Sequence, residues 1–231
     1  GASWGRGVKT VEWGNGNLQM TSAQIMSLYC LAKRKQAMGH LMGGGIRIAD
    51  ITSGRRTIRQ AENYTLTQSD VSRITGLLTA DQRRVADALQ GFMTGQCAEW
   101  GNEVSMRRFG YRAFTEANYF PIETDSNNRR GVDEHAQETS MFRLLNLSAT
   151  KALTPNANNA IVIRDIFDVF TAHSADMAKY NALALPLLDT LKWYNFVEKT
   201  KDKEGKVTTR RVQTSMEIAY GTDAKKYFQN F

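Results

Sequence analysis

The stretch RRFGYRAF, at residues 107–114, interleaves arginines with aromatic rings. Guanidinium groups neutralise phosphates and aromatic rings stack on bases, so this composition suits the binding of nucleic acid. Further arginines lie on either side of it, in GRRTIR and NNRR. The residues that this hypothesis assigns to nucleic-acid binding are Arg55, Arg56, Arg59, Arg107, Arg108, Phe109, Tyr111, Arg112, Arg129 and Arg130.

The same stretch fits in part the base-stacking strand of RNA-recognition domains, which alternates aromatic residues with small ones after a basic residue. Arg108 and Arg112 depart from that pattern, because they occupy a glycine position and an apolar position. Residues 79–106 before it have helical spacing and leave no partner strand. The rings are therefore expected to open an aromatic-rich extended arm that faces the domain's own core, a protein partner or nucleic acid.

Other chemistry is weakly signalled. Ser148 and Lys151 have the Ser-x-x-Lys spacing of some hydrolases, but the motifs that accompany it there are missing. His40, His135 and His173 lie far apart, and the sequence has no Cys-x-x-Cys unit. The glycines of GHLMGGGIRI follow a predicted helix, whereas a phosphate cradle needs them before one. We predict no catalytic residue, no metal ligand and no cofactor.

Composition limits the class of protein. The 231 residues, 42% of them hydrophobic, suffice for a buried core, and the net charge of +7 makes a polyanionic partner plausible. Cys30 and Cys97 lie far apart in helix-like segments, which is typical of reduced thiols in a cytoplasmic protein. Nowhere do 18 apolar residues run together, so no contact with a membrane is predicted.

These features must be positioned by a mainly helical chain. Thr21, Thr67 and Thr79 are natural N-cap residues before amphipathic runs, and Thr21 has Gln24 at the capping-box spacing. The predicted helices run from Thr21 to the glycines at 43–45, over 68–77, over 80–107, and over 160–195 with a kink at Pro186. Lys33, Arg34 and Lys35 are expected to form a polar patch on the first of them.

Strands and turns complete the prediction. Residues 8–21 read as a β-hairpin with an Asn-Gly turn, and EKTKDKEGKVTTRR as an exposed hairpin or a loop. A basic linker covers TSGRRTIRQAEN, and short helices are expected after Thr214. The fold class is mainly α: an irregular helical domain with long amphipathic helices, a small N-terminal β-hairpin and the aromatic-rich extended arm.

Residues 1–7 are expected to be a tag or a disordered start, and 8–231 a single mostly helical domain or two subdomains, 8–110 and 111–231. The apolar ending KKYFQNF suggests excision from a longer chain.

Several segments carry a resemblance to a known group of proteins. They include MTSAQIMSLYCLAKRKQAMGHLMGGGIRI, LTADQRRVADALQGFMTGQCAEWGNEVSMRRFGYRAFTEANYFPIETD, LNLSATKALTPNANNAIVIRDIFDVFTAHSADMAKYNALALPLLDTLKWYNF and AYGTDAKKYF. They resemble a helical accessory region of the large multidomain polyvalent proteins of bacteriophages and integrative mobile elements. The resemblance implies a bacterial cytoplasmic setting, including delivery with phage DNA, and it carries over no catalytic residue.

Three functional hypotheses follow. The first is a non-enzymatic structural or interaction module of a phage or mobile-element multidomain protein, which contacts other modules of its parent chain or a protein partner. The second is a nucleic-acid-binding module that uses its basic and aromatic surface on DNA or RNA. The third is a hydrolase that uses Ser148 and Lys151.

Overall fold

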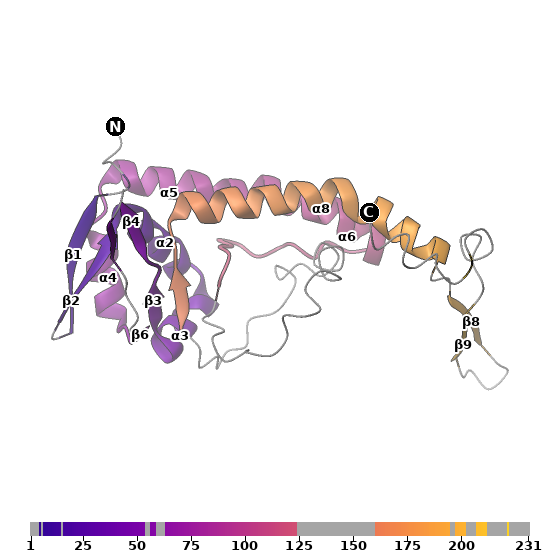
Figure 1. Ribbon diagram of the computed structural model, residues 1–231, viewed down its shortest axis with the longest axis horizontal. Helices are drawn as coiled ribbons and strands as arrows, with labels where there is room; N and C mark the ends of the chain where they lie inside the picture. Colours follow the sequence, from indigo (N-terminus) through magenta and orange to yellow (C-terminus); the bar gives the residue numbers. More distant parts are fainter. Residues whose placement is uncertain are drawn as a thin grey trace. The chain divides into compact units, whose positions relative to one another are not determined.

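The computed structural model describes residues 5, 7–14, 16–53, 56–58, 63–123, 160–194, 197–201, 207–211 and 221 of the chain. Helices predominate among them, as the mainly α prediction requires (Figure 1). The chain divides into two compact units, one of residues 1–131 and 147–178 and the other of residues 132–146 and 179–231. Within the described part, no helix has the length and apolarity to cross a membrane.

The first unit begins with the predicted hairpin. Strands β1 (Val8–Trp13) and β2 (Gly16–Thr21) pair antiparallel, and Gly14, directly after β1, lies in a turn. Val11 and Leu18 lie opposite each other and are buried. The alternation of apolar and polar residues thus places one face of the hairpin on the core, as a half-buried strand pair requires.

Three threonines start helices as predicted. Thr21, Thr67 and Thr79 are the N-caps of α2 (Ser22–Ala32), α4 (Gln68–Gly76) and α5 (Ala80–Phe92). In each case the threonine side chain accepts from the backbone N–H of the third helical residue, whose side chain in turn accepts from the threonine N–H. These capping boxes satisfy backbone donors that a helix start would otherwise leave without partners.

The first predicted helix is in fact two helices. α2 ends at Ala32, and α3 (Lys35–Gly44) starts after Arg34, whose backbone is extended. The expectation that Arg34 belongs to a polar patch is wrong, because its side chain is only 7% exposed. Its guanidinium pairs with the carboxylate of Glu116 and donates to the carbonyl of Phe120 at 3.2 Å. These partners are more than 80 residues away, so the local sequence does not announce the break.

A three-stranded sheet lies beside these helices. Its central strand β3 (Ile46–Ile48) pairs antiparallel with β6 (Asn63–Tyr64) and parallel with β7 (Ile161–Ile163). The prediction of helix from residue 160 is wrong for β7, whose β-branched residues pair instead with a strand from the other end of the unit. The basic linker also contains regular structure, the short hairpin of β4 (Ile51–Ser53) and β5 (Arg56–Ile58).

The last predicted helix starts later than expected. α8 (Ile166–Tyr194) follows Asp165, whose carboxylate accepts from the Phe167 N–H at 2.8 Å, and the helix continues through Pro186. The Asp165 carboxylate therefore acts at the helix start, where a negative side chain is favourable.

A second long helical element crosses the first unit. α5 is continuous with the π-helical turn η1 (Met93–Cys97) and with α6 (Ala98–Phe109), as Figure 1 shows. The Phe92 and Phe170 rings lie 5.5 Å apart, and Cys97 Sγ lies 3.8 Å from Ser174 Oγ. These contacts advance in the same direction along both elements, so the start of α8 packs parallel to this long helix.

The hydrophobic core collects side chains from nearly every element of the first unit. It includes residues of β1, β2, α2, α3, β3, α4 and α5, then Phe120, and finally β7 and the first residue of α8. Its fully buried large side chains include Leu18, Met20, Ile25, Met26, Leu28, Leu41, Ile46, Ile48 and Ile74.

The second unit contains the C-terminal part of α8 and a hairpin. Strands β8 (Val197–Lys201) and β9 (Val207–Arg211) pair antiparallel, with Lys199 opposite Thr209. This confirms a hairpin in the charged segment. The short helices predicted after Thr214 lie outside the described residues except at position 221, as do all residues from 124 to 159.

Candidate functional site

The stretch RRFGYRAF spans the end of α6 and the turn that follows. α6 ends at Phe109, and Gly110 takes the left-handed conformation, with a φ of 79° and its N–H bonded to the Met106 carbonyl. Such a C-cap favours glycine, because other side chains pay a steric penalty there. After Gly110 the chain turns back along α6. Residues 111–123, called the return segment below, have no regular secondary structure.

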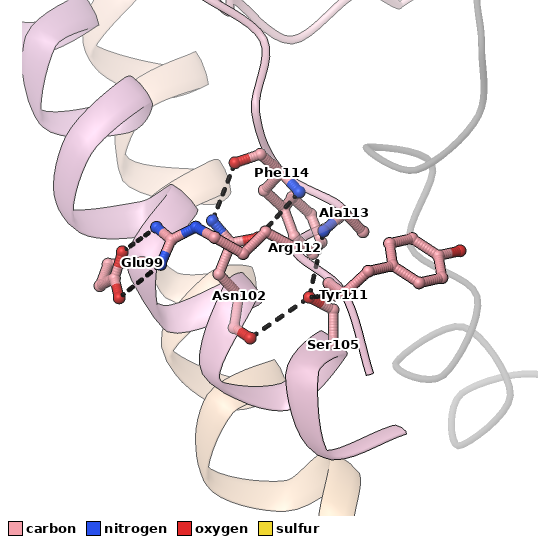
Figure 2. Close-up of polar contacts among 7 residues, drawn as sticks. All are labelled: Glu99, Asn102, Ser105, Tyr111, Arg112, Ala113 and Phe114. Atoms are coloured by element: carbon pink, nitrogen blue, oxygen red, sulfur yellow. Dashed lines mark hydrogen bonds and ion pairs between the residues drawn. The ribbon is translucent and has the colours of Figure 1, made fainter. Parts of the chain in front are cut away.

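Polar side chains of α6 hold the return segment in place (Figure 2). The Asn102 amide donates to the Phe114 carbonyl and its oxygen accepts from the Phe114 N–H, both at 2.9 Å. The Ser105 hydroxyl accepts from the Ala113 N–H at 3.2 Å and faces the Tyr111 carbonyl at 3.0 Å. Asn102 and Ser105 are buried, so these contacts are shielded from water. They substitute for the strand or helix that would otherwise pair this backbone.

An ion pair also links the return segment to α6. The Arg112 guanidinium makes two contacts with the Glu99 carboxylate, one of them at 3.3 Å (Figure 2). Hydrogen bonding by Arg112 lowers the pKa of Glu99. Both side chains are about half exposed, so the pair contributes little to stability. The charge of Arg112 is nevertheless directed at its own chain.

Exposed apolar side chains gather beside this anchored turn. Met106 is 47% exposed, Phe109 48% and Tyr111 60%. The Phe109 and Tyr111 rings lie 5.8 Å apart and are tilted by 30°, and the Arg108 guanidinium lies 4.7 Å from the centre of the Phe109 ring. We call Met106, Arg107, Arg108, Phe109 and Tyr111 the aromatic-basic patch. Its rings are presented to solvent by a helix end and a fixed turn.

The rest of the return segment faces inward. The Gln90 amide donates to the Asn118 carbonyl at 2.7 Å, and Phe120 is buried in the core. The Tyr119 ring lies 5.4 Å from the Arg34 guanidinium and 5.3 Å from the His173 ring. Burial raises the pKa of Tyr119 to about 12 and lowers that of His173 to about 4, so both are neutral at pH 7.

Among the described residues, neither the cysteines nor possible metal ligands form a reactive site. Cys30 and Cys97 are buried free thiols, and burial raises the pKa of Cys30 to about 12, which leaves it protonated at neutral pH. In the part of the chain that the structure describes, no three histidine, cysteine or acidic side chains are placed to hold a metal ion.

The predicted nucleic-acid residues are placed as follows. Arg107, Arg108, Phe109, Tyr111 and Arg112 lie together around the end of α6. Arg56 lies in β5, where only its backbone is described. The positions of Arg55, Arg59, Arg129 and Arg130, and of Ser148 and Lys151, lie outside the described residues.

Sequence reasoning missed the side chains that organise the site. Asn102, Ser105 and Arg34 are buried polar residues whose partners are backbone groups or acids of the return segment. The available signal was a polar residue on the inward face of an amphipathic helix, which is uncommon unless it has a hydrogen-bond partner.

Comparisons of the chain with protein-family models, with curated proteins and with solved structures give no match.

Proposed function

We propose that this chain is a non-enzymatic interaction module of a phage or mobile-element multidomain protein, and that the aromatic-basic patch is its binding surface. The observation that carries the proposal is the exposure of Met106 and Phe109 at the end of α6 and of Tyr111 on the anchored turn that follows. Aromatic and arginine side chains dominate the binding energy of protein interfaces. Because the turn is already fixed by α6, little conformational entropy is lost when a partner binds.

The polar groups near the patch support a structural role. Asn102 and Ser105 use their hydrogen bonds on the backbone of the return segment, and Glu99 pairs with Arg112. Each of these groups therefore helps to position the return segment. The partner is another module of the parent chain or a separate protein in the bacterial cytoplasm.

Site-specific crosslinking tests this proposal. A photo-reactive benzoylphenylalanine at position 111 of the parent protein, activated in bacterial cells, is expected to form one defined adduct with a segment outside residues 1–231 or with a second protein. Leu77 is similarly exposed, at 43%, and serves as the control position. The Phe109→Ala variant should lose the adduct. If positions 111 and 77 give the same products, the patch is not a binding surface.

A second candidate function is the binding of single-stranded nucleic acid by the same patch. The observation in its favour is the arrangement of three neighbouring side chains. The Arg108 guanidinium lies over the Phe109 ring, and the Phe109 ring lies beside that of Tyr111. Aromatic platforms of this kind bind bases without sequence preference, at about 1–3 kcal/mol per stacked base.

Fluorescence anisotropy with a short single-stranded DNA or RNA at two salt concentrations separates this candidate from general charge attraction. Phe109→Ala should weaken binding about tenfold, and Arg107→Gln should reduce the salt dependence by roughly one released counterion. Arg84→Gln removes the same charge from a distant, largely exposed position of α5. Equal effects of Arg107→Gln and Arg84→Gln would mean that only the net charge matters.

A further inference from the structure

A cavity of about 240 Å³ lies within the first unit, on the inner side of the return segment. It opens between α2, residues 119–123, β7 and the first turns of α8. Apolar side chains form somewhat more than half of its wall, and they include Leu31, Phe120, Ile122, Val162, Val169 and Met177. No residue of the aromatic-basic patch lines it, so its role is separate from that of the patch.

One wall carries a hydroxyl group without a partner. Ser27 is 1% exposed and lines the cavity, and its Oγ makes no hydrogen bond within the described part of the chain. It stands one turn before Leu31 of α2, and Leu31 and Arg34, which follows the end of α2, line the same cavity. A buried hydroxyl without a partner is unfavourable, because it has lost its hydrogen bonds to water without replacing them. Such a group is explained when a molecule in the cavity supplies the missing hydrogen bond.

The charged groups around the cavity favour an uncharged molecule. Arg34 is neutralised by Glu116, and Arg164 pairs with Glu123 at 2.9 Å. His173 is buried enough to remain neutral. An ionic ligand would lose its hydration without gaining a free counter-charge inside.

At the mouth, the acidic side chains of Asp168 and Asp176 are exposed to solvent. Their charge further disfavours an anion.

The size and shape of the walls favour a flat ring system. The rings of Tyr119 and His173 contact each other along one side, and both line the cavity. An apolar cavity of about 150 Å³ accepts benzene, so one of about 240 Å³ has room for a fused bicyclic ring. Flat rings also bury apolar area against aromatic neighbours in offset or edge contacts.

We propose that the cavity between α2 and α8 binds a small, uncharged, bicyclic heteroaromatic molecule with one hydrogen-bonding group directed at the Ser27 hydroxyl. The Tyr119 and His173 rings contact the ring system, and the apolar wall supplies most of the binding energy.

Titration of the ¹⁵N-labelled 231-residue chain with indole tests the proposal. Indole should shift the amide signals around Ser27 in α2 and around His173 in α8, and the shifts should saturate. Indene has the same shape without the N–H and should bind about two- to tenfold more weakly, as the loss of one hydrogen bond predicts. Indole-2-carboxylate, which is charged, should cause no saturable shift at these positions.

Two pairs of variants make the test specific. Ser27→Ala should remove the preference for indole over indene, whereas Ser69→Ala, at an exposed position of α4, should retain it. Ala172→Phe places a ring in the cavity and should abolish indole binding. Ala175→Phe adds the same ring at an exposed position of α8 that does not line the cavity, and should leave binding unchanged.

Three results would overturn the proposal: no saturable shift with indole, an undiminished preference for indole in Ser27→Ala, or equal effects of the two phenylalanine variants. None of these results would bear on the aromatic-basic patch, which is tested by crosslinking at position 111.

Discussion

At the scale of single residues, a buried amide replaces secondary structure. Asn102 occupies both the N–H and the carbonyl of Phe114, as a neighbouring strand would do. We expect Asn102→Ala to lower the free energy of unfolding by about 2 kcal/mol, because two backbone groups lose their partner in a largely buried place. Chemical denaturation with urea measures this change. Phe109 and Tyr111 should also lose their fixed orientation, which NMR signals assigned to these two rings would detect.

Asn102→Asp refines this prediction. The carboxylate retains an acceptor for the Phe114 N–H but opposes the Phe114 carbonyl, so the destabilisation should equal or exceed that of the alanine variant. Gln96→Ala, at an exposed position of η1, is the control and should change the unfolding free energy little. Equal stabilities of Asn102→Ala and Gln96→Ala would show that the clamp on Phe114 does not stabilise the fold.

His173 should make stability depend on pH. Burial lowers its pKa in the folded chain to about 4, although nearby Asp176 acts in the opposite direction; in the unfolded chain the pKa is about 6.5. Between these values the unfolded chain holds a proton that the folded chain lacks, so the free energy of unfolding falls as the pH falls from about 6.5 to 4. Below pH 4 this histidine adds no further loss.

The His173→Phe variant isolates this contribution. Between pH 7 and pH 4.5 the wild-type chain should lose on the order of 2 kcal/mol more stability than the variant. Urea denaturation of both proteins at the two pH values measures the difference, from which the shared carboxylates cancel. Equal losses would show that His173 is not held neutral by its surroundings.

At the scale of elements, a glycine allows the return segment and α8 to approach α6 together. A Cβ atom on Gly101 would lie 2.6 Å from the Phe114 ring and 2.7 Å from the Met177 methyl group. Gly101→Ala should therefore destabilise the protein by about 1–3 kcal/mol, the usual cost of overpacking. Thermal or urea unfolding measures it.

Gly91 provides the matched control on the same long helix. A Cβ atom there meets no other atom within 4 Å. Gly91→Ala should stabilise the chain by up to about 1 kcal/mol, because alanine is the better helix former. The two identical substitutions are thus expected to have opposite signs. A stabilising Gly101→Ala would mean that the three elements do not meet at this residue.

The elements that the sequence predicts well are those with local signals. Thr21, Thr67 and Thr79 mark helix starts through contacts three residues away, and β1 pairs with β2, the next strand in the sequence. The missed features depend on distant partners. The extended backbone at Arg34 accompanies contacts with Glu116 and Phe120, and residues 161–163 form a strand because β3 is available.

The features of the candidate site fall into the same two groups, those with a local sequence signal and those that depend on distant partners. RRFGYRAF predicts aromatic and basic residues at the end of a helix, because their density is visible in the sequence, but it leaves open whether the rings face the core or a partner. The burial of Ser27 and the clamp by Asn102 were not predictable, because each depends on which helix face the return segment and α8 cover.

At the scale of the whole molecule, the first unit is assembled from two separate stretches of chain. Residues 8–123 supply most of the core. The strand that pairs parallel with β3, however, is β7, which belongs to the second stretch. Ile161, Ile163 and Ile166 are fully or almost fully buried, and the start of α8 covers the side of the long helix that carries Phe92 and Cys97. A fragment without residues 160–178 therefore exposes Ile46, Ile48 and this helix face to water.

Two fragments test this dependence. Residues 1–178, which contain the whole first unit, should unfold in one cooperative transition with native-like near-ultraviolet circular dichroism. Residues 1–131 should bind a hydrophobic dye and unfold without a sharp transition, because burying three isoleucines contributes several kcal/mol, roughly 1.5–3 each, and domains are marginally stable by about 5–15 kcal/mol. A double substitution, Ile161→Ser with Ile163→Ser, should give residues 1–178 the behaviour of the shorter fragment. If residues 1–131 fold cooperatively by themselves, β7 and α8 are additions to a finished core rather than parts of it.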